Sequence, residues 1–200
     1  QSRGLGDVYK RQERKALELC SGSVLDVGGG AGCHSLALQD RGLDVTAVDI
    51  SKLSVEVMER RGVKKALAVD LFDESFVGCY DTVLMLMNGS GVVGRLERML
   101  LFFRRMKQLL SPRGCVLMDS SDLRYVFEDE DGCMDIDLNA AYYGEVDFRM
   151  QYKQIKGRSF DWLYVDFDTL SYYAAENGFK AERIADGSHY DYLARLTMNQ

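Results

Sequence analysis

The chain has 200 residues, of which 46% are hydrophobic and 28% are charged, with a single proline and a formal net charge of −6. This is the composition of an ordinary globular domain, and a chain of this length buries about 70% of its unfolded surface, so its core needs no disulfide or metal. The acidic balance argues against a nucleic-acid ligand, because proteins that bind nucleic acids usually carry a basic patch.

The five cysteines are scattered and include no CxxC pair, which argues against both a disulfide framework and a zinc site. Free thiols indicate a reducing compartment, so we expect a cytoplasmic protein. No apolar run is long enough for a transmembrane helix, and we therefore expect no membrane contact. We also expect no metal ion.

Helical and strand patterns alternate along the chain, which predicts a parallel sheet covered by helices. Residues 1–12 fit neither pattern and resemble translated adaptor sequence, so we expect a non-native or disordered leader there. Residues 13–200 are expected to form one domain with an insertion at 123–165. The predicted strands are 23–27, 44–48, 65–69, 81–87, 115–118, 180–185 and 192–198. The predicted helices are 31–41, 52–61, 96–110 and 168–177.

Residues 111–114 predict a turn, and the insertion predicts a hairpin of residues 144–153 and 159–165 joined across Gly157. The acidic stretch 127–139 does not fit a calcium loop, because Phe127 and Leu138 occupy positions that require acids. It is either a solvated loop or a lid that prefers a cationic or amine substrate. Tyr142 and Tyr143 either line that lid or simply pack.

The most informative segment is Val24–Gly32 (VLDVGGGAG), in which a strand containing Asp26 runs into a glycine cluster and then directly into a helix. Such glycines let a ligand approach the backbone, and the helix start presents free N–H groups. A dinucleotide fingerprint would need glycine at position 33, which is Cys33. A carboxylate before the glycines would repel a pyrophosphate but suits a ligand with ammonium and sulfonium groups. The spacing therefore favours the cationic ligand.

Two more acids end the next predicted strands, Asp49 in Ala47–Ser51 and Asp70 in Ala68–Leu71. Open α/β sheets bind ligands at the carboxyl ends of their strands. Acids at three successive strand ends on this edge are hard to attribute to chance, although a single one could be a helix cap or a turn residue.

With these residues the chain resembles the class I S-adenosylmethionine-dependent methyltransferases, over about residues 21–122 and 169–198. The resemblance implies an α/β fold with a doubly wound, mostly parallel seven-stranded sheet (the Rossmann-like methyltransferase fold), an antiparallel last strand and a small hairpin insertion. It implies S-adenosylmethionine as cofactor and a small-molecule methyl acceptor. Asp49 would accept the ribose hydroxyls, and Asp70 the adenine amino group. The cofactor-binding residues expected are Asp26, Gly28, Gly30, Gly32, His34, Asp49, Ile50, Asp70, Leu71 and Asn88.

No catalytic residue is named, because methyl transfer from a sulfonium to a neutral nucleophile can rely on alignment and exclusion of water. Asn88 is followed by Gly-Ser-Gly rather than Pro-Pro-aromatic, which argues against planar exocyclic amines as acceptors. His34 and His189 are expected to be structural or to lie beside the cofactor.

Two alternative functions remain open. The segment Asp119–Asp122 (DSSD) also occurs in aminopropyltransferases of the spermidine synthase type, and a non-catalytic cofactor-binding module would keep the same fold. We expect acceptor choice to lie in residues 123–165 together with whatever precedes Ala16. Replacing that insertion should then leave cofactor affinity unchanged.

Overall fold

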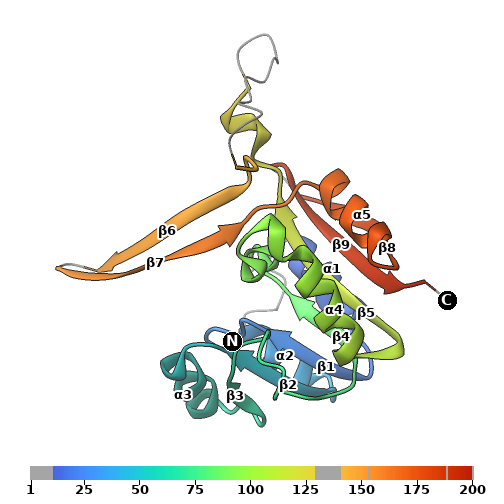
Figure 1. The fold of residues 1–200 in the computed structure, drawn as a ribbon. Coiled ribbons are helices and arrows are strands. Elements are labelled where there is room, and N and C mark those ends of the chain that lie inside the picture. Colours follow the sequence, from blue (N-terminus) through green and yellow to red (C-terminus); the bar gives the residue numbers. More distant parts are fainter. Residues whose placement is uncertain (1–10, 129–140, 153, 188, 200) are drawn as a thin grey trace.

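The computed structural model describes residues 11–128, 141–152, 154–187 and 189–199. Its centre is a seven-stranded sheet in the order β3-β2-β1-β4-β5-β9-β8 (Figure 1). Strand β9 runs antiparallel to β5 and β8, whereas the other neighbours pair in parallel. This confirms the predicted fold class. The strands are β1 (Ser23–Val27), β2 (Asp44–Asp49), β3 (Ala66–Ala68), β4 (Tyr80–Met85), β5 (Leu110–Ser121), β8 (Phe179–Asp186) and β9 (Asp191–Met198).

Helices cover both faces of the sheet, with α1, α2 and α3 on one face and α4 and α5 on the other. Strand β4 shows why the arrangement is stable: Val83 and Met85 enter one hydrophobic core and Leu84 enters the other, all fully buried. Each such side chain contributes about 1.5–3 kcal/mol by leaving water. The helices are α1 (Arg11–Leu19), α2 (Cys33–Asp40), α3 (Lys52–Arg61), α4 (Met99–Leu109) and α5 (Phe167–Glu176), with 3₁₀ helices η2 (Gly89–Val93), η3 (Leu96–Arg98) and η4 (Leu123–Val126).

Local sequence determines where these helices begin and end. The Ser51 hydroxyl accepts a hydrogen bond from the Ser54 N–H at 3.3 Å and caps α3. Asp166 caps α5 in the same way, through the Thr169 N–H at 2.9 Å. A cap of this kind is worth about 1 kcal/mol. Gly178 follows α5 with φ of 75°, a left-handed conformation that glycine adopts without steric cost.

The predicted turn at residues 111–114 is wrong, because β5 begins at Leu110 and includes this segment. The pairing with β4 jumps from Tyr80↔Leu110 to Thr82↔Cys115, so the intervening residues of β5 bulge out of the ladder. Helix α1 was not predicted, because the first helix expected from the sequence is 31–41. Its first two residues, Arg11 and Gln12, belong to the predicted leader.

The insertion forms the predicted hairpin, made of β6 (Glu145–Tyr152) and β7 (Ile155–Leu163), but it does not turn at Gly157. Tyr152 pairs with Ile155, and Gly157 lies inside β7. A Cβ atom on Gly157 would lie 3.2 Å from the Met150 carbonyl oxygen, so this glycine allows a close approach of the two backbones.

The hairpin is a separate two-stranded sheet that extends from the body as an arm (Figure 1). In the part of the chain that the structure describes, no helix has the length and apolarity needed to cross a membrane.

Candidate active site

A cavity of about 510 Å³ lies at the carboxyl ends of β1, β2 and β3, where the sequence predicted ligand binding. Of the predicted cofactor-binding residues, five line it: Gly28, Asp49, Ile50, Asp70 and Leu71. The other lining residues are Val27, Val48, Val69, Phe72, Gly91, Val92, Gly94, Arg98, Phe160, Asp161 and Trp162. We name this space the β1–β3 cavity. Apolar walls with a few carboxylates suit a flat nucleoside with a polar sugar.

The glycine loop is fastened to the end of β2. The N–H groups of Gly28 and Gly29 donate to the Val48 carbonyl at 2.8 and 3.1 Å, and the Gly30 N–H donates to Asp49 Oδ2 at 3.0 Å. Gly28 has φ of 72°, and a Cβ placed on it would have only a Val92 methyl within 4 Å, at 3.9 Å. The loop therefore leaves its backbone open to a ligand on the cavity side.

Both oxygens of Asp49 already accept backbone hydrogen bonds, Oδ2 from Gly30 and Oδ1 from Ser51 at 2.8 Å. A carboxylate offers about four acceptor sites, so each oxygen keeps capacity for one more donor. Asp49 lines the cavity, so these remaining acceptor sites belong to a residue of its wall.

The far end of the cavity is formed by the segment after β3. Asp70 is exposed, and its Oδ1 accepts the Phe72 N–H at 2.9 Å. The Leu71 carbonyl accepts the Arg105 Nε at 2.7 Å, which fixes the backbone of this segment from the core side. The guanidinium of Arg98 lies 4.3 Å from the centre of the Phe72 ring. This end has the acceptor and the flat apolar surface that an adenine ring requires.

Two of the predicted residues, Asp26 and Gly32, are packed inside the protein. Neither is among the described residues that line this cavity. Asp26 is 2% exposed and its Oδ2 accepts the Ser35 hydroxyl at 2.5 Å; burial raises the pKa of Asp26. A Cβ on Gly32 would lie 2.7 Å from a Val63 methyl, so this glycine is required by the packing of the loop against the region after α3. Both residues shape the loop from behind.

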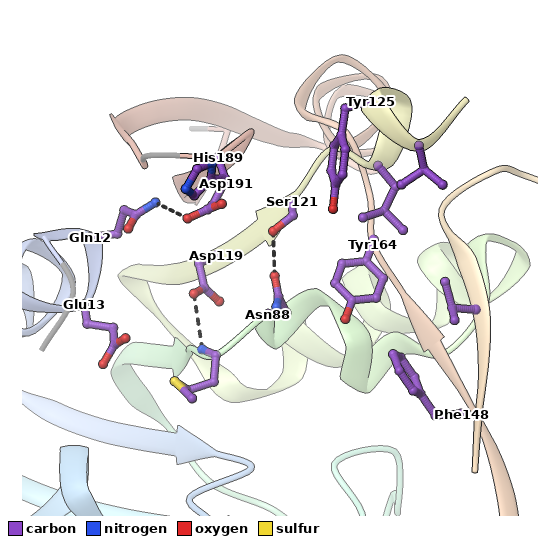
Figure 2. A pocket seen from close by; sticks show the side chains of 14 residues that line it. Gln12, Glu13, Asn88, Asp119, Ser121, Tyr125, Phe148, Tyr164, His189 and Asp191 are labelled. Carbon is purple, nitrogen blue, oxygen red and sulfur yellow. Dashed lines mark hydrogen bonds between the residues drawn. The ribbon is translucent and has the colours of Figure 1, made fainter. Parts of the chain in front are cut away.

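A second cavity, of about 630 Å³, lies beside the ends of β4 and β5 (Figure 2). We name it the β4–β5 cavity. Helix α1, the ends of β4 and β5, the hairpin and the β8–β9 turn all contribute to it. Its lining residues are Gln12, Glu13, Met87, Asn88, Asp119, Ser121, Leu123, Tyr125, Val126, Val146, Phe148, Tyr164, His189 and Asp191.

Asp119 holds the turn after β4 in an unusual conformation. Its Oδ2 accepts the Met87 N–H at 3.2 Å and its Oδ1 accepts the Gly89 N–H at 2.9 Å. Met87 and Asn88 both have left-handed backbones, with φ of 66° and 59°, which costs about 1–2 kcal/mol for each residue. The two hydrogen bonds offset this strain. Burial raises the pKa of Asp119 to about 6.

The β4–β5 cavity is bordered by three carboxylates from three elements, Glu13 of α1, Asp119 of β5 and Asp191 of β9. Glu13 Oε2 lies 3.2 Å from His34 Nε2, so the predicted cofactor residue His34 faces α1. His189 lines the same cavity, on the edge of the sheet where the sequence placed it. Asn88 also lines it, and its Oδ1 accepts the Ser121 hydroxyl at 2.9 Å.

The hairpin contributes to both cavities. Val146 and Phe148 of β6 line the β4–β5 cavity, whereas Phe160, Asp161 and Trp162 of β7 line the β1–β3 cavity. Replacement of the insertion would therefore remove a wall of the cavity that contains Asp49 and Asp70. The expectation that such a replacement leaves cofactor affinity unchanged stays a prediction.

The hydroxyl groups of Tyr142 and Tyr143 form hydrogen bonds with carboxylates. Neither residue is among the described lining residues of the two cavities. The Tyr142 hydroxyl donates to Asp166 Oδ2 at 2.5 Å, and the Tyr143 hydroxyl donates to Asp122 Oδ1 at 2.8 Å. The acidic stretch 127–139 lies outside the described residues except for its first two positions. The lid interpretation of that stretch stays a prediction.

Sequence reasoning missed Asp119, Glu13 and Trp162 as site residues. For Asp119 a signal existed, since it ends a predicted strand on the ligand edge, like Asp49 and Asp70. Glu13 and Trp162 reach the site only through the docking of α1 and the hairpin, which no local pattern encodes.

Comparisons with known proteins agree with this geometry. A family model described as a methyltransferase domain matches residues 24–114. The chain is 65% identical to an S-adenosylmethionine-dependent methyltransferase from Bacteroides fragilis, solved in complex with S-adenosyl-L-homocysteine; the match covers 96% of this chain and 79% of that one, with a TM-score of 0.91. The sugar N-methyltransferase KedS8 from Streptoalloteichus sp ATCC 53650 has the same fold, with 16% identity, coverage of 99% and 91%, and a TM-score of 0.68.

A curated relative, the cypemycin N-terminal methyltransferase of Streptomyces sp, is 31% identical over 103 residues. This match covers 50% of the chain and 42% of the relative, so the chain matches less than half of that protein's length. The comparisons do not favour the aminopropyltransferase or the non-catalytic alternative. Within the DSSD segment, Asp119 holds the turn after β4 and Asp122 caps η4. The chain belongs to the class I S-adenosylmethionine-dependent methyltransferases, a family of enzymes whose cofactor is S-adenosylmethionine.

Proposed function

We propose that this methyltransferase transfers a methyl group to an amine nitrogen of a small molecule held in the β4–β5 cavity, with the adenosine part of the cofactor in the β1–β3 cavity. When bound, the cofactor supplies an electrophilic methyl group on a sulfonium sulfur. Asp49 would accept the ribose hydroxyls, Asp70 and the Leu71 N–H would bind the adenine, and the turn at Asn88 would face the methionine end.

The glycine loop supports this arrangement. Gly28 presents open backbone at the cavity, and the N–H groups of Gly28, Gly29 and Gly30 are occupied by Val48 and Asp49. A rigid loop needs little reorganisation when a ligand binds, which favours affinity. Asp26 and Gly32 would act by holding the loop in this shape, and His34 by fixing α1 through Glu13.

The observation that carries the acceptor class is the lining of the β4–β5 cavity. Three carboxylates (Glu13, Asp119 and Asp191) border it together with a single histidine and no lysine or arginine among its described lining residues. Carboxylates in a partly desolvated cavity favour a cationic group, because it adds to the hydrogen bonds that offset their desolvation. Burial raises the pKa of Asp119 to about 6 even though its carboxylate accepts two backbone hydrogen bonds. An ammonium group would reduce this desolvation cost, and a carboxylate of the cavity would take its proton so that the neutral nitrogen can accept the methyl group.

Aromatic side chains complete the argument. Tyr125, Phe148 and Tyr164 form part of the cavity wall, and aromatic faces attract cations. The relative that methylates the N-terminus of cypemycin also acts on a terminus that carries an amine, in keeping with an amine acceptor. The cytoplasmic location expected from the cysteines stays a prediction.

The test is a methyl-transfer assay with radiolabelled S-adenosylmethionine against matched panels of small amines, alcohols and carboxylic acids. We expect labelled product from amines and none from acids. Turnover restricted to alcohols or acids would contradict the amine acceptor while leaving the methyltransferase intact.

A further inference from the structure

The base of the β6–β7 hairpin has one apolar face and one acidic face. The cross-strand pairs Val146↔Trp162 and Phe148↔Phe160 alternate with the pair Asp147↔Asp161. Because side chains alternate between the two faces of a strand, the first two pairs share one face and the aspartates lie on the other.

The apolar face spans both cavities. Val146 and Phe148 line the β4–β5 cavity, while their partners Trp162 and Phe160 line the β1–β3 cavity. The rings of Phe148 and Phe160 are stacked with their centres 6.0 Å apart. A displacement of the hairpin would therefore move a wall of both cavities together.

The acidic face is bound to the body by one arginine. Arg95, at the start of η3, places Nη2 at 2.6 Å from Asp161 Oδ1 and 2.9 Å from Asp147 Oδ1, and Nη1 at 3.2 Å from Glu145 Oε2. The other oxygen of Glu145 accepts the Leu96 N–H at 2.8 Å. Asp147 and Asp161 are directly opposed, and like charges at such positions repel each other unless a cation lies between them.

Trp162 shows how closely the hairpin is seated. A Cβ atom placed on Gly91 of η2 would lie 1.8 Å from the indole ring, so the ring rests directly on the glycine backbone. An isolated two-stranded hairpin is only marginally stable in water, and the contacts with η2 and Arg95 fix its base.

We propose that Arg95 is a positioning residue that holds the β6–β7 hairpin as a shared wall, so that Trp162 and Phe160 close the cofactor cavity while Val146 and Phe148 close the acceptor cavity. The inference rests on the proposed placement of the cofactor in the β1–β3 cavity. It adds that cofactor affinity depends on the cluster of ion pairs that Arg95 forms with Glu145, Asp147 and Asp161. Of these four residues, only Asp161 is among the described lining residues of the β1–β3 cavity.

Trp162 provides the assay, because it is the only tryptophan of the chain. We would titrate the purified full chain and its Arg95→Ala and Arg95→Lys variants with S-adenosyl-L-homocysteine, and follow tryptophan fluorescence and calorimetric affinity in parallel. Arg104→Ala is the matched control, since it removes the same charge from the exposed Arg104–Glu74 pair.

We expect wild type and Arg104→Ala to show the same affinity and the same fluorescence change. Arg95→Ala should lose about tenfold in affinity, which corresponds to ~1.4 kcal/mol, and most of the fluorescence change. Arg95→Lys should lie between them, because an ammonium group cannot reproduce the fork of contacts to several carboxylates. A structural defect alone would not be graded in this way between two folded variants.

An Arg95→Ala protein that binds with unchanged affinity and unchanged fluorescence would overturn the inference. If Arg95→Ala does not fold, the Asp147→Asn variant replaces it, because this substitution weakens the same cluster at an exposed position. The inference then requires that Asp147→Asn reduce the fluorescence change on ligand binding. The Asp49→Ala variant separates the two proposals. If Asp49→Ala loses affinity for S-adenosyl-L-homocysteine and Arg95→Ala does not, only the role of Arg95 is defeated. No loss in either variant defeats the cofactor placement.

Discussion

The Asp49→Ala substitution is the most direct test of the cofactor site. In the structure, Asp49 uses one lone pair of each oxygen on Gly30 and Ser51, which leaves one on each for the ribose hydroxyls. Two hydrogen bonds to a charged acceptor contribute about 3 kcal/mol together. At ~1.4 kcal/mol for each factor of ten, the affinity for S-adenosyl-L-homocysteine should fall about 100-fold.

The assay is isothermal calorimetry on folded protein, with circular dichroism and melting temperature recorded for each variant. Asp44→Ala is the matched control, because it removes a carboxylate from the opposite end of the same strand, where Asp44 pairs with Lys65 at 2.7 Å. Its affinity should equal that of the wild type. Asp49→Asn should be intermediate, since one acceptor oxygen remains. An unchanged affinity in a folded Asp49→Ala protein would refute the assignment.

Three other predictions follow from the structure. S-adenosylmethionine and S-adenosyl-L-homocysteine should raise the melting temperature while NAD does not, since only a ligand that binds the folded state stabilises it; a shift with NAD alone would contradict the cofactor site. Gly91→Ala should displace the Trp162 ring and change its fluorescence, at a cost of about 1–3 kcal/mol in unfolding free energy from overpacking; an unaltered spectrum would contradict the contact. Burial raises the pKa of Asp119 to about 6, above the ordinary carboxyl value, so the native state retains a proton that the unfolded chain has lost. Its contribution to stability should be fully present below about pH 4 and be lost as the pH rises through about 6, and Asp119→Asn should remove this slope in urea unfolding.

The predictions that the structure confirmed come from segments in which local chemistry and tertiary environment agree. Strand β1 and helix α3 have the predicted bounds, because an apolar run and a serine cap act on their immediate neighbours. Asp49 and Asp70 reach one cavity because the carboxyl ends of parallel strands meet at one edge. These features require only periodicity and sheet geometry.

Predictions failed where a distant contact decided the outcome. The Ser111–Gly114 segment reads locally as a turn, but pairing with β4 draws it into β5. Gly157 was predicted to lie in a turn. It lies inside β7, where the absence of a side chain allows the Met150 backbone to approach closely. For Tyr142 and Tyr143 the sequence left two roles open, a lid or packing, and distant carboxylates of Asp166 and Asp122 accept hydrogen bonds from their hydroxyl groups.

The sequence alone determined the order of strands and helices from β1 onward, the glycine loop and the acids at the strand ends. Each of these depends on residues within one or two turns of chain. Only the tertiary structure decided what closes the site. Glu13, Asp119 and Trp162 come from α1, β5 and β7, which are distant in sequence. Glu13 and Asp119 reach the β4–β5 cavity and Trp162 the β1–β3 cavity because α1 docks on the sheet and Arg95 binds carboxylates of both hairpin strands. Such contacts depend on the shapes and charges of surfaces that exist only after the chain has folded.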